Sequence, residues 1–415
     1  MNRFCFILFL FASTVQAQTY PAFKDLPSQQ AVDPLVGMDG TKITSAAEWN
    51  TKRKPELQHL FEYYMYGRKP DAIKVTAKIL FEDKQVFGGK ATLREVEISF
   101  PSESCPKSYL LMALPNKAQG PVPCFLGYNF TGNHSLLADK RIHLPTVWML
   151  GSENKAQPNR ATEEGRGKQV DTWNLEYIID RGYAVATLYY GDIDPDRADQ
   201  RLGVQKHLWK LKTPEDDDPA SVMVWAWGSS RILDYLETDK AIDSKKVALV
   251  GHSRLGKATI VAGAFDERFA VVIPHQAGCG GTAPSRTKNP KNESVERINK
   301  AFPHWFDTNF KQFGPDTSKL PFDQNCLMAL CAPRPLLITN AIEDEWANPA
   351  GQFQMLKSAE PVYKLLKAGE CASEKMPEVG QFIDSKLGYW IRPGKHSMIK
   401  DDWKIFCDFA DKWLR

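Results

Sequence analysis

The stretch "KKVALVGHSRLGKATI", residues 245–260, decides how the chain is organised around it. An apolar run that meets a glycine and then a helix-like segment predicts a buried strand turning sharply into a helix, with Ser253 at the corner. Gly251 matches the first glycine of the G-x-S-x-G elbow, but Leu255 stands in the place of the second. We expect Gly256, one residue later, to meet the same packing need. Because a serine before a helix is also commonly an N-cap, the motif alone leaves a nucleophile and a cap both open.

Outward from this corner, the pattern predicts an α/β architecture. Residues 45–67 have helical apolar spacing and a glycine stop, and residues 74–81, 92–100 and 108–115 alternate like antiparallel strands. After residue 122, apolar strand-like runs alternate with helical ones, the strands falling near residues 122–130, 183–191, 247–252, 270–276, 333–342 and 387–394. This alternation predicts a mostly parallel central sheet with helices on both faces, a three-layer sandwich.

The ends and the polar tracts complete the predicted organisation. Residues 1–17 have an early arginine, an apolar run and a small-residue exit, which predicts a cleaved signal peptide and an exported protein. Residues 18–415 are expected to form a single domain with an N-terminal lead-in. The polar, turn-rich stretches 151–169 and 283–300 are interpreted as surface insertions.

Composition narrows the function. With 53 basic and 50 acidic residues the net charge is only +3, which argues against a nucleic-acid partner or a membrane-binding surface. Seven cysteines follow residue 17 without C-x-x-C spacing, so we expect no metal and no cofactor, although an exported protein could form disulfides. Eleven tryptophans suit a carbohydrate-active protein, but most of them are expected in the core. We expect a monomer.

A serine nucleophile requires a base and an acid. His396 lies in a loop after the last strand-like run and before a final amphipathic helix, where hydrolases with the chain order Ser, acid, His carry their base. The acid should follow an intervening strand, and Glu343, Asp344 and Glu345 stand together there. We favour Asp344, although all three remain candidates. The neighbouring His252 is expected to point to the opposite side of the elbow and to pack.

Two basic residues follow the serine in the predicted helix. The backbone N–H of Arg254, in the first helical turn, can point at an oxyanion. Lys257 lies one turn after Ser253, where a cation opposes the helix dipole, so either a polar partner faces it or its chain bends into solvent.

Several motifs together resemble the glucuronoyl esterases, carbohydrate esterase family 15, over most of the chain from Gly127 onward. The motifs are "GYNFTGNH", "GHSRLGK", "FPHWFDTNF", "LPFDQNCLMALCAPRPLLI", "EDEWANP" and "GKHSMIKDDW". The resemblance implies an α/β-hydrolase that cleaves the ester between 4-O-methyl-glucuronic acid of xylan and the alcohols of lignin. It also implies that Ser253 is the nucleophile, that His396 is the base and that Arg254 helps to bind the oxyanion. Lys257, Glu293 and Trp346 would contact the sugar acid.

One position departs from the pattern of many members, especially fungal ones. They carry a triad Glu soon after the nucleophile, whereas "PHQAGCGG" places Gln276 there, and an amide cannot be the anionic partner of an imidazolium. Some bacterial members use an acid after the later strand, which is where Asp344 stands. An acetyl xylan esterase or other carbohydrate deacetylase on the same fold, and a non-catalytic carbohydrate-binding protein, remain alternatives.

Overall fold

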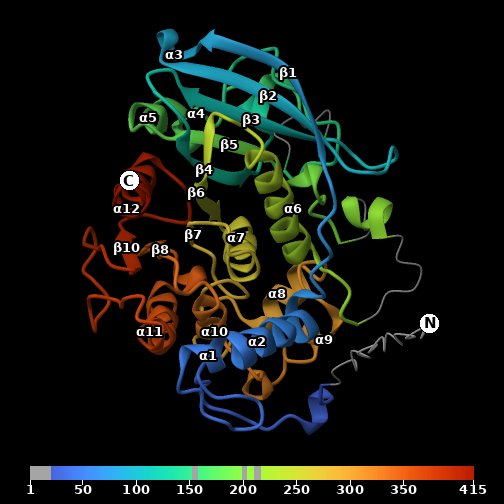
Figure 1. The fold of residues 1–415 in the computed structure, drawn as a ribbon. Coiled ribbons are helices and arrows are strands. Elements are labelled where there is room, and N and C mark those ends of the chain that lie inside the picture. The colour runs from blue at the N-terminus through green and yellow to red at the C-terminus, as the bar shows by residue number, and fades with distance from the viewer. Residues whose placement is uncertain (1–19, 152–157, 199–202, 210–215) are drawn as a thin grey trace, which may run out of the picture.

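A ten-stranded sheet forms the centre of the computed structural model, which describes residues 20–151, 158–198, 203–209 and 216–415 (Figure 1). The strands stand in the order β1-β2-β3-β5-β4-β6-β7-β8-β10-β9. Their bounds are β1 Thr76–Gln85, β2 Ala91–Ser99, β3 Ser108–Pro115, β4 Val122–Asn129, β5 Ala184–Tyr189, β6 Ile242–His252, β7 Val271–His275, β8 Leu336–Ala341, β9 Phe382–Ile383 and β10 Leu387–Arg392.

Strand direction follows the predicted division of the chain. β1, β2 and β3 pair antiparallel, β3 joins β5 antiparallel, and the six strands from β5 through β10 in the sheet order are parallel. The short β9 closes the far edge antiparallel to β10. The predicted antiparallel edge and mostly parallel centre are therefore confirmed.

Helices cover both faces of the sheet, as predicted. On one face pack α4 (Val170–Trp173), α5 (Leu175–Asp180) and α12 (Lys400–Leu414). On the other lie α2 (Lys54–Phe61), α6 (Ser221–Leu236), α7 (Arg254–Phe265), α10 (Gln324–Ala329) and α11 (Pro349–Leu365). Successive side chains of a strand point alternately into the two cores. Phe125 of β4 packs with α12, whereas Cys124 and Leu126 belong to the larger core.

The remaining elements are short. They are α1 Ala46–Glu48, α3 Val86–Gly89, α8 Val295–Ala301 and α9 Thr308–Lys311, with single turns η1 Phe23–Asp25, η2 Trp49–Arg53, η3 Glu62–Tyr66, η4 Asn133–Ser135, η5 Glu163–Gly165, η6 Tyr190–Asp192, η7 Gln205–Trp209, η8 Thr317–Lys319 and η9 Glu345–Ala347. Within the described ranges, no helix has the length and apolar character needed to cross a bilayer. The predicted signal peptide, residues 1–17, lies outside the described residues, and the assignment of residues 18–415 to one domain stays a prediction.

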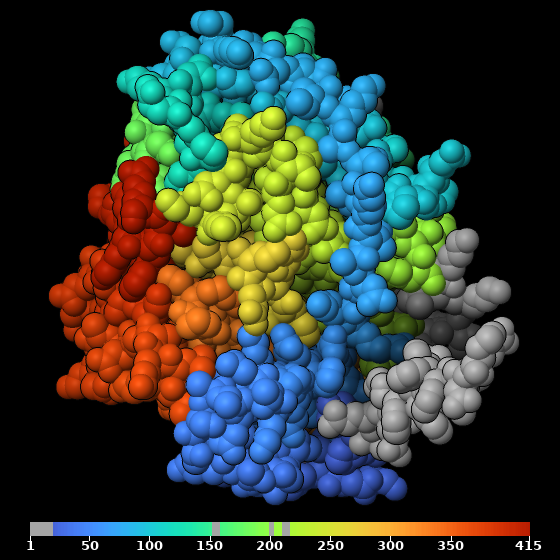
Figure 2. Space-filling view, viewed as in Figure 1, coloured from blue at the N-terminus to red at the C-terminus, as the bar shows by residue number. Residues whose placement is uncertain are grey.

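The lead-in helix is an integral part of the core. From α1 through η3 it runs as one helical segment that ends at Gly67, whose φ of 79° and ψ of 164° are open to glycine but strained for other residues. Trp49, Leu57 and Phe61 are fully buried. Figure 2 shows this blue segment packed across one end of the molecule, and its Tyr66 hydroxyl donates to the carbonyl of Gly280 at 3.2 Å.

The prediction that residues 283–300 form a surface insertion is wrong for its second half. Asn292 and Glu293 are nearly buried, and Val295 and Ile298 of α8 lie in the main core. The polar composition misled the sequence interpretation, because these buried polar side chains find partners that are distant in sequence: Asn292 Nδ2 donates to the carbonyl of Glu345 at 2.6 Å.

Candidate active site

The strand-to-helix corner has the geometry of a nucleophile elbow. Ser253 stands between β6 and α7 with φ 59° and ψ −125°, a conformation that is strained for any residue with a side chain. Its side chain makes no capping bond to the helix, so the N-cap alternative is wrong. A Cβ on Gly251 would come within 2.3 Å of the Leu255 carbonyl oxygen, and one on Gly256 within 2.9 Å of the His275 carbonyl oxygen. Gly256 therefore provides the close approach that the shifted motif predicted.

The loop after β8 presents one of its three acids to the imidazole of His396. Asp344 Oδ2 lies 2.6 Å from His396 Nδ1, and this carboxylate is almost fully buried. The carboxylate of Glu343 instead accepts the backbone N–H of Gly394 at 3.0 Å. Glu345 is largely exposed and pairs with Lys291. Since the carboxylate accepts at Nδ1, the ring keeps its proton there and Nε2 is left as the basic nitrogen.

Two other histidines lie beside the loop that carries His396. His275 Nε2 donates to the carbonyl of Ser397 at 2.8 Å and is completely buried, which lowers the pKa of His275. His252 packs, as predicted, but it does not point away from the site: its ring centroid is 4.5 Å from that of His396. Burial, together with these two neighbouring imidazoles, keeps the pKa of His252 well below its usual range. A neutral imidazole therefore lies against the ring of His396.

Gln276 occupies the position at which many fungal members carry the triad Glu, and it contacts the loop that carries His396. Its Oε1 accepts the backbone N–H of Ser397 at 3.0 Å, one residue after His396. This bond identifies Oε1 as the oxygen end of the amide. The buried Nε2 then has no partner among the described residues. Ser397 is held from the other side by Arg392, whose Nη2 donates to its carbonyl at 2.7 Å.

Lys257 has partners for all of its protons. Its ammonium donates to the carbonyls of Ala277 at 2.7 Å and Cys279 at 2.6 Å, and to Glu293 Oε2 at 3.1 Å. Both Lys257 and Glu293 are nearly buried, so the alternative of a lysine bent into solvent is wrong. An ammonium has three donors, so a sugar hydroxyl would have to replace one of these acceptors to reach it.

Arg254 is held by a carboxylate that the sequence analysis did not single out. Its Nη1 forms a short ion pair with Asp196 Oδ2, and its guanidinium carbon lies 4.8 Å from the ring centroid of Trp305. The Nε of Arg254 is buried and has no hydrogen-bond partner in the described part of the chain. The one signal for Asp196 was its position: it follows a predicted parallel strand at the edge where ligands gather.

These side chains meet on one cavity of about 320 Å³. All seven predicted site residues line it: Ser253, Arg254, Lys257, Glu293, Asp344, Trp346 and His396. Gln276, Phe302 and Trp305 complete much of the wall. Trp346 is 45% exposed, with the guanidinium of Arg297 5.6 Å from its ring centroid. No hydrogen bond joins Ser253 Oγ to His396 within the described ranges, and such bonds are often loose before a substrate binds.

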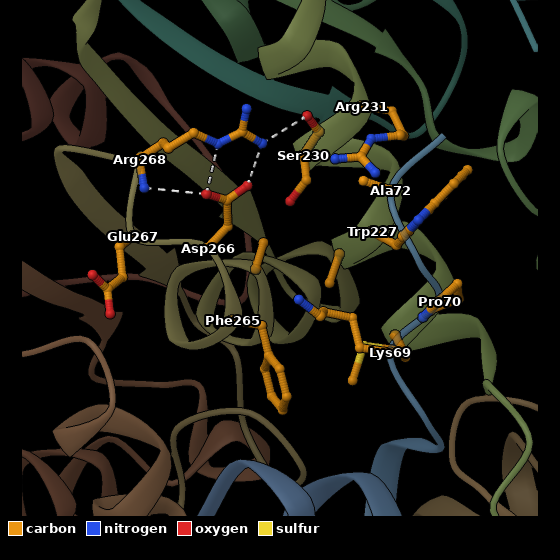
Figure 3. Close-up of a pocket in the computed structure, with 13 residues that line it drawn as sticks. Lys69, Pro70, Ala72, Trp227, Ser230, Arg231, Phe265, Asp266, Glu267 and Arg268 are labelled. Atoms are coloured by element: carbon orange, nitrogen blue, oxygen red, sulfur yellow. Dashed lines mark hydrogen bonds and ion pairs between the residues drawn. The ribbon is translucent and has the colours of Figure 1, made fainter. Parts of the chain in front are cut away.

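Other features of the molecule are separate from this cavity. Figure 3 shows a second pocket at the opposite end of α7, where Arg268 binds Asp266 near Phe265 and Trp227. Among the described residues, no group of three or more His, Cys, Asp or Glu side chains is arranged to hold a metal ion. The seven described cysteines are all buried and unpaired.

A sheet of this topology with a strained serine elbow at the carboxyl end of a central strand defines an α/β-hydrolase. Comparison with known proteins identifies its family. Residues 158–367 match the family model described as "Glucuronyl esterase, fungi". A carbohydrate esterase from an unknown prokaryotic organism is 45% identical over 93% of this chain and 90% of its own length. The chain belongs to the glucuronoyl esterases, carbohydrate esterase family 15, and is an esterase.

Two further relatives extend this comparison. The solved glucuronoyl esterase from Solibacter usitatus has a TM-score of 0.86 and 36% identity, covering 94% of this chain and all of that one. The 4-O-methyl-glucuronoyl methylesterase of Phanerochaete carnosa is 26% identical over 85% of this chain and 77% of its own length. The predicted family and fold are confirmed, whereas the role of each site residue stays a prediction.

Proposed function

We propose that this protein hydrolyses esters of 4-O-methyl-glucuronic acid, the class that joins xylan to lignin alcohols. The observation that carries the proposal is the convergence of an elbow serine, a His–Asp pair and a buried Lys–Glu pair on one cavity. The serine and the His–Asp pair suit acyl transfer. The Lys–Glu pair beside them forms a polar wall suited to the acyl side of the ester, which in a uronate is a sugar ring.

The chemistry follows from the positions of these groups. His396 Nε2 takes the proton of Ser253 as the hydroxyl attacks the uronoyl C6 carbonyl, and Asp344 stabilises the imidazolium that forms. The unpartnered Nε–H of Arg254 and its backbone N–H stabilise the oxyanion. The alcohol leaves with the proton from His396, and water then repeats the sequence on the acyl-enzyme.

The sugar-binding roles fall on the remaining wall. Glu293 has one oxygen occupied by Lys257, which leaves the other to accept a sugar hydroxyl. Lys257 acts mainly by holding Glu293 and the loop of Ala277 and Cys279 in place. The half-exposed ring of Trp346 offers a face for the sugar or the alcohol.

Substrate comparison tests this proposal. Purified protein should hydrolyse methyl or benzyl D-glucuronate with a kcat/KM at least about 100-fold above that for an acetylated xyloside, because an acetyl group has nothing for Glu293 and Trp346 to bind. The reverse preference would indicate a deacetylase.

Covalent labelling tests whether Ser253 is the nucleophile of this esterase. A serine-directed phosphonate should label Ser253 in the wild type and fail to label Ser253→Ala or His396→Ala. The matched control is Ser230→Ala, at the far pocket of Figure 3, which should label normally. Turnover without labelling of Ser253 would refute the proposed serine nucleophile.

We also propose that the protein is exported and works as a monomer. The export proposal rests on the N-terminal sequence pattern, and it is tested by sequencing the N-terminus of the mature protein, which should begin at residue 18.

A further inference from the structure

Asp196 is the point at which one wall of the active-site cavity is held together. Its Oδ1 accepts from His304 Nε2 and from Trp305 Nε1, each at 2.7 Å. Its Oδ2 accepts from Tyr190 Oη at 3.0 Å and pairs with Arg254 Nη1. Four donors are about the full capacity of a carboxylate, so Asp196 has no lone pair left for a ligand.

This carboxylate is buried and ionised. Only 4% of Asp196 is exposed. Burial acts to raise its pKa, but the hydrogen bond from His304 and the charge of Arg254 outweigh burial, and the pKa falls to about 2. A buried charge requires such compensation. Since Asp196 is saturated, any effect it has on the reaction must pass through its donors, of which Arg254 and Trp305 line the cavity.

Among the described residues, the two cationic side chains that line the cavity, Arg254 and Lys257, each pair with a carboxylate. Arg254 pairs with Asp196, Lys257 pairs with Glu293, and His396 bonds to Asp344. The positive charges of Arg254 and Lys257 are thus each offset by a carboxylate, and Arg297, against Trp346, is a further cation nearby. This matters because the proposed reaction starts from a neutral ester and ends with a carboxylate anion at the same carbon.

We propose that Asp196 is a positioning residue that fixes the direction of Arg254 and cancels its charge, so that the cavity favours the neutral ester over the anionic product. The inference rests on the proposed uronate substrate. Arg254 is held by Nη1, and its Nε–H, which is buried and has no partner among the described residues, is the donor that the proposal assigns to the oxyanion. An oxyanion is present only transiently, and a single directed N–H is enough to stabilise it. An uncompensated guanidinium would attract the product carboxylate as well and slow its release.

Charge removal at Asp196 separates this role from a purely structural one. In Asp196→Asn, kcat on methyl glucuronate should fall about 100-fold, as expected for a misdirected oxyanion donor. Glucuronate should bind at least about tenfold more tightly than to the wild type, because Arg254 is no longer neutralised. Binding of the neutral analogue glucuronamide should not tighten. Loosened packing alone would weaken both ligands.

The matched control is Tyr190→Phe, which removes one donor from Asp196 and leaves its charge in place. This variant should show no tightening toward glucuronate. Equal tightening in Tyr190→Phe and Asp196→Asn, or none in Asp196→Asn, overturns the proposal.

A wild-type measurement decides the matter if Asp196→Asn does not fold. Titration calorimetry at a pH of about 8, where free imidazole is neutral, should find that glucuronate binds no better than glucuronamide. Preference for glucuronate by about tenfold or more overturns the inference. Because calorimetry does not depend on turnover, the two proposals can fail separately: a wild type without activity on methyl glucuronate refutes the function, whereas an active one that prefers the anion refutes only the role of Asp196.

Discussion

Replacing Asp344 by Asn is the sharpest test of the proposed roles of His396 as base and Asp344 as its acid. The carboxylate lies 2.6 Å from His396 Nδ1 and its side chain is only 3% exposed. Opposite charges about 4 Å apart at an effective dielectric of about 20 interact by about 4 kcal/mol, and this interaction exists only once His396 is protonated in the transition state. About 4 kcal/mol corresponds to roughly a thousandfold in rate. An asparagine can also hold the ring in the wrong tautomer, so kcat should fall about 10³- to 10⁴-fold.

The assay is steady-state hydrolysis of methyl or benzyl glucuronate, with circular dichroism to check folding. KM should change little, because the Asp344 carboxylate is almost fully buried and bonds to His396. Glu343→Gln and Glu345→Gln are the matched controls, since they remove the neighbouring charges but not the bond to His396, and both should stay within about twofold of wild type. A kcat for Asp344→Asn within about tenfold of wild type would refute the reasoning, and a large loss in either control would move the acid to that residue.

Three further predictions follow from buried polar groups. Burial raises the pKa of Asp192 to about 8, so the native state takes up a proton that the unfolded state does not, and stability rises as the pH falls from about 8 toward 4. Asp192→Asn should therefore raise the melting temperature at pH 8 by a few degrees and flatten its pH dependence, measured by scanning calorimetry; an unchanged profile would contradict the assignment. Lys257→Met leaves Glu293 buried without its cation and should lower the free energy of unfolding by about 3–5 kcal/mol, measured by chemical denaturation. The double variant Lys257→Met/Glu293→Leu should recover part of this loss, and no recovery would argue against the pair. Gln276→Leu removes the acceptor for Ser397 and should lower kcat roughly tenfold with KM unchanged, while Gln276→Glu keeps the acceptor and should stay near wild type; equal losses in both would contradict this.

Much of the fold was predictable because local patterns and long-range packing agree. The apolar runs that became β4 to β8 have the period and length of buried parallel strands, and the corner at Ser253 indicated where a ligand would bind. Residues 292–299 were misjudged because a polar segment is buried only when distant partners satisfy it, and those partners cannot be read from local composition.

The site was predictable for residues at the ends of strands and not for those that support them. Asp344 and His396 follow β8 and β10 directly, so their meeting followed from parallel pairing of those strands. Which of three adjacent acids would face the imidazole depended on the turn after β8. Asp196 was missed because its importance lies in four donors from three separate segments, which no spacing reveals.

The amide at position 276 fits a site in which the acid lies elsewhere. Gln276 accepts the Ser397 N–H and so fixes the residue next to the base, a task that either an amide or a carboxylate oxygen can perform. The amide anchors the loop of His396, while Asp344 is the carboxylate that bonds to the imidazole. With Asp344 bonded to His396, position 276 needs only an acceptor for the Ser397 N–H, and the amide of Gln276 provides it.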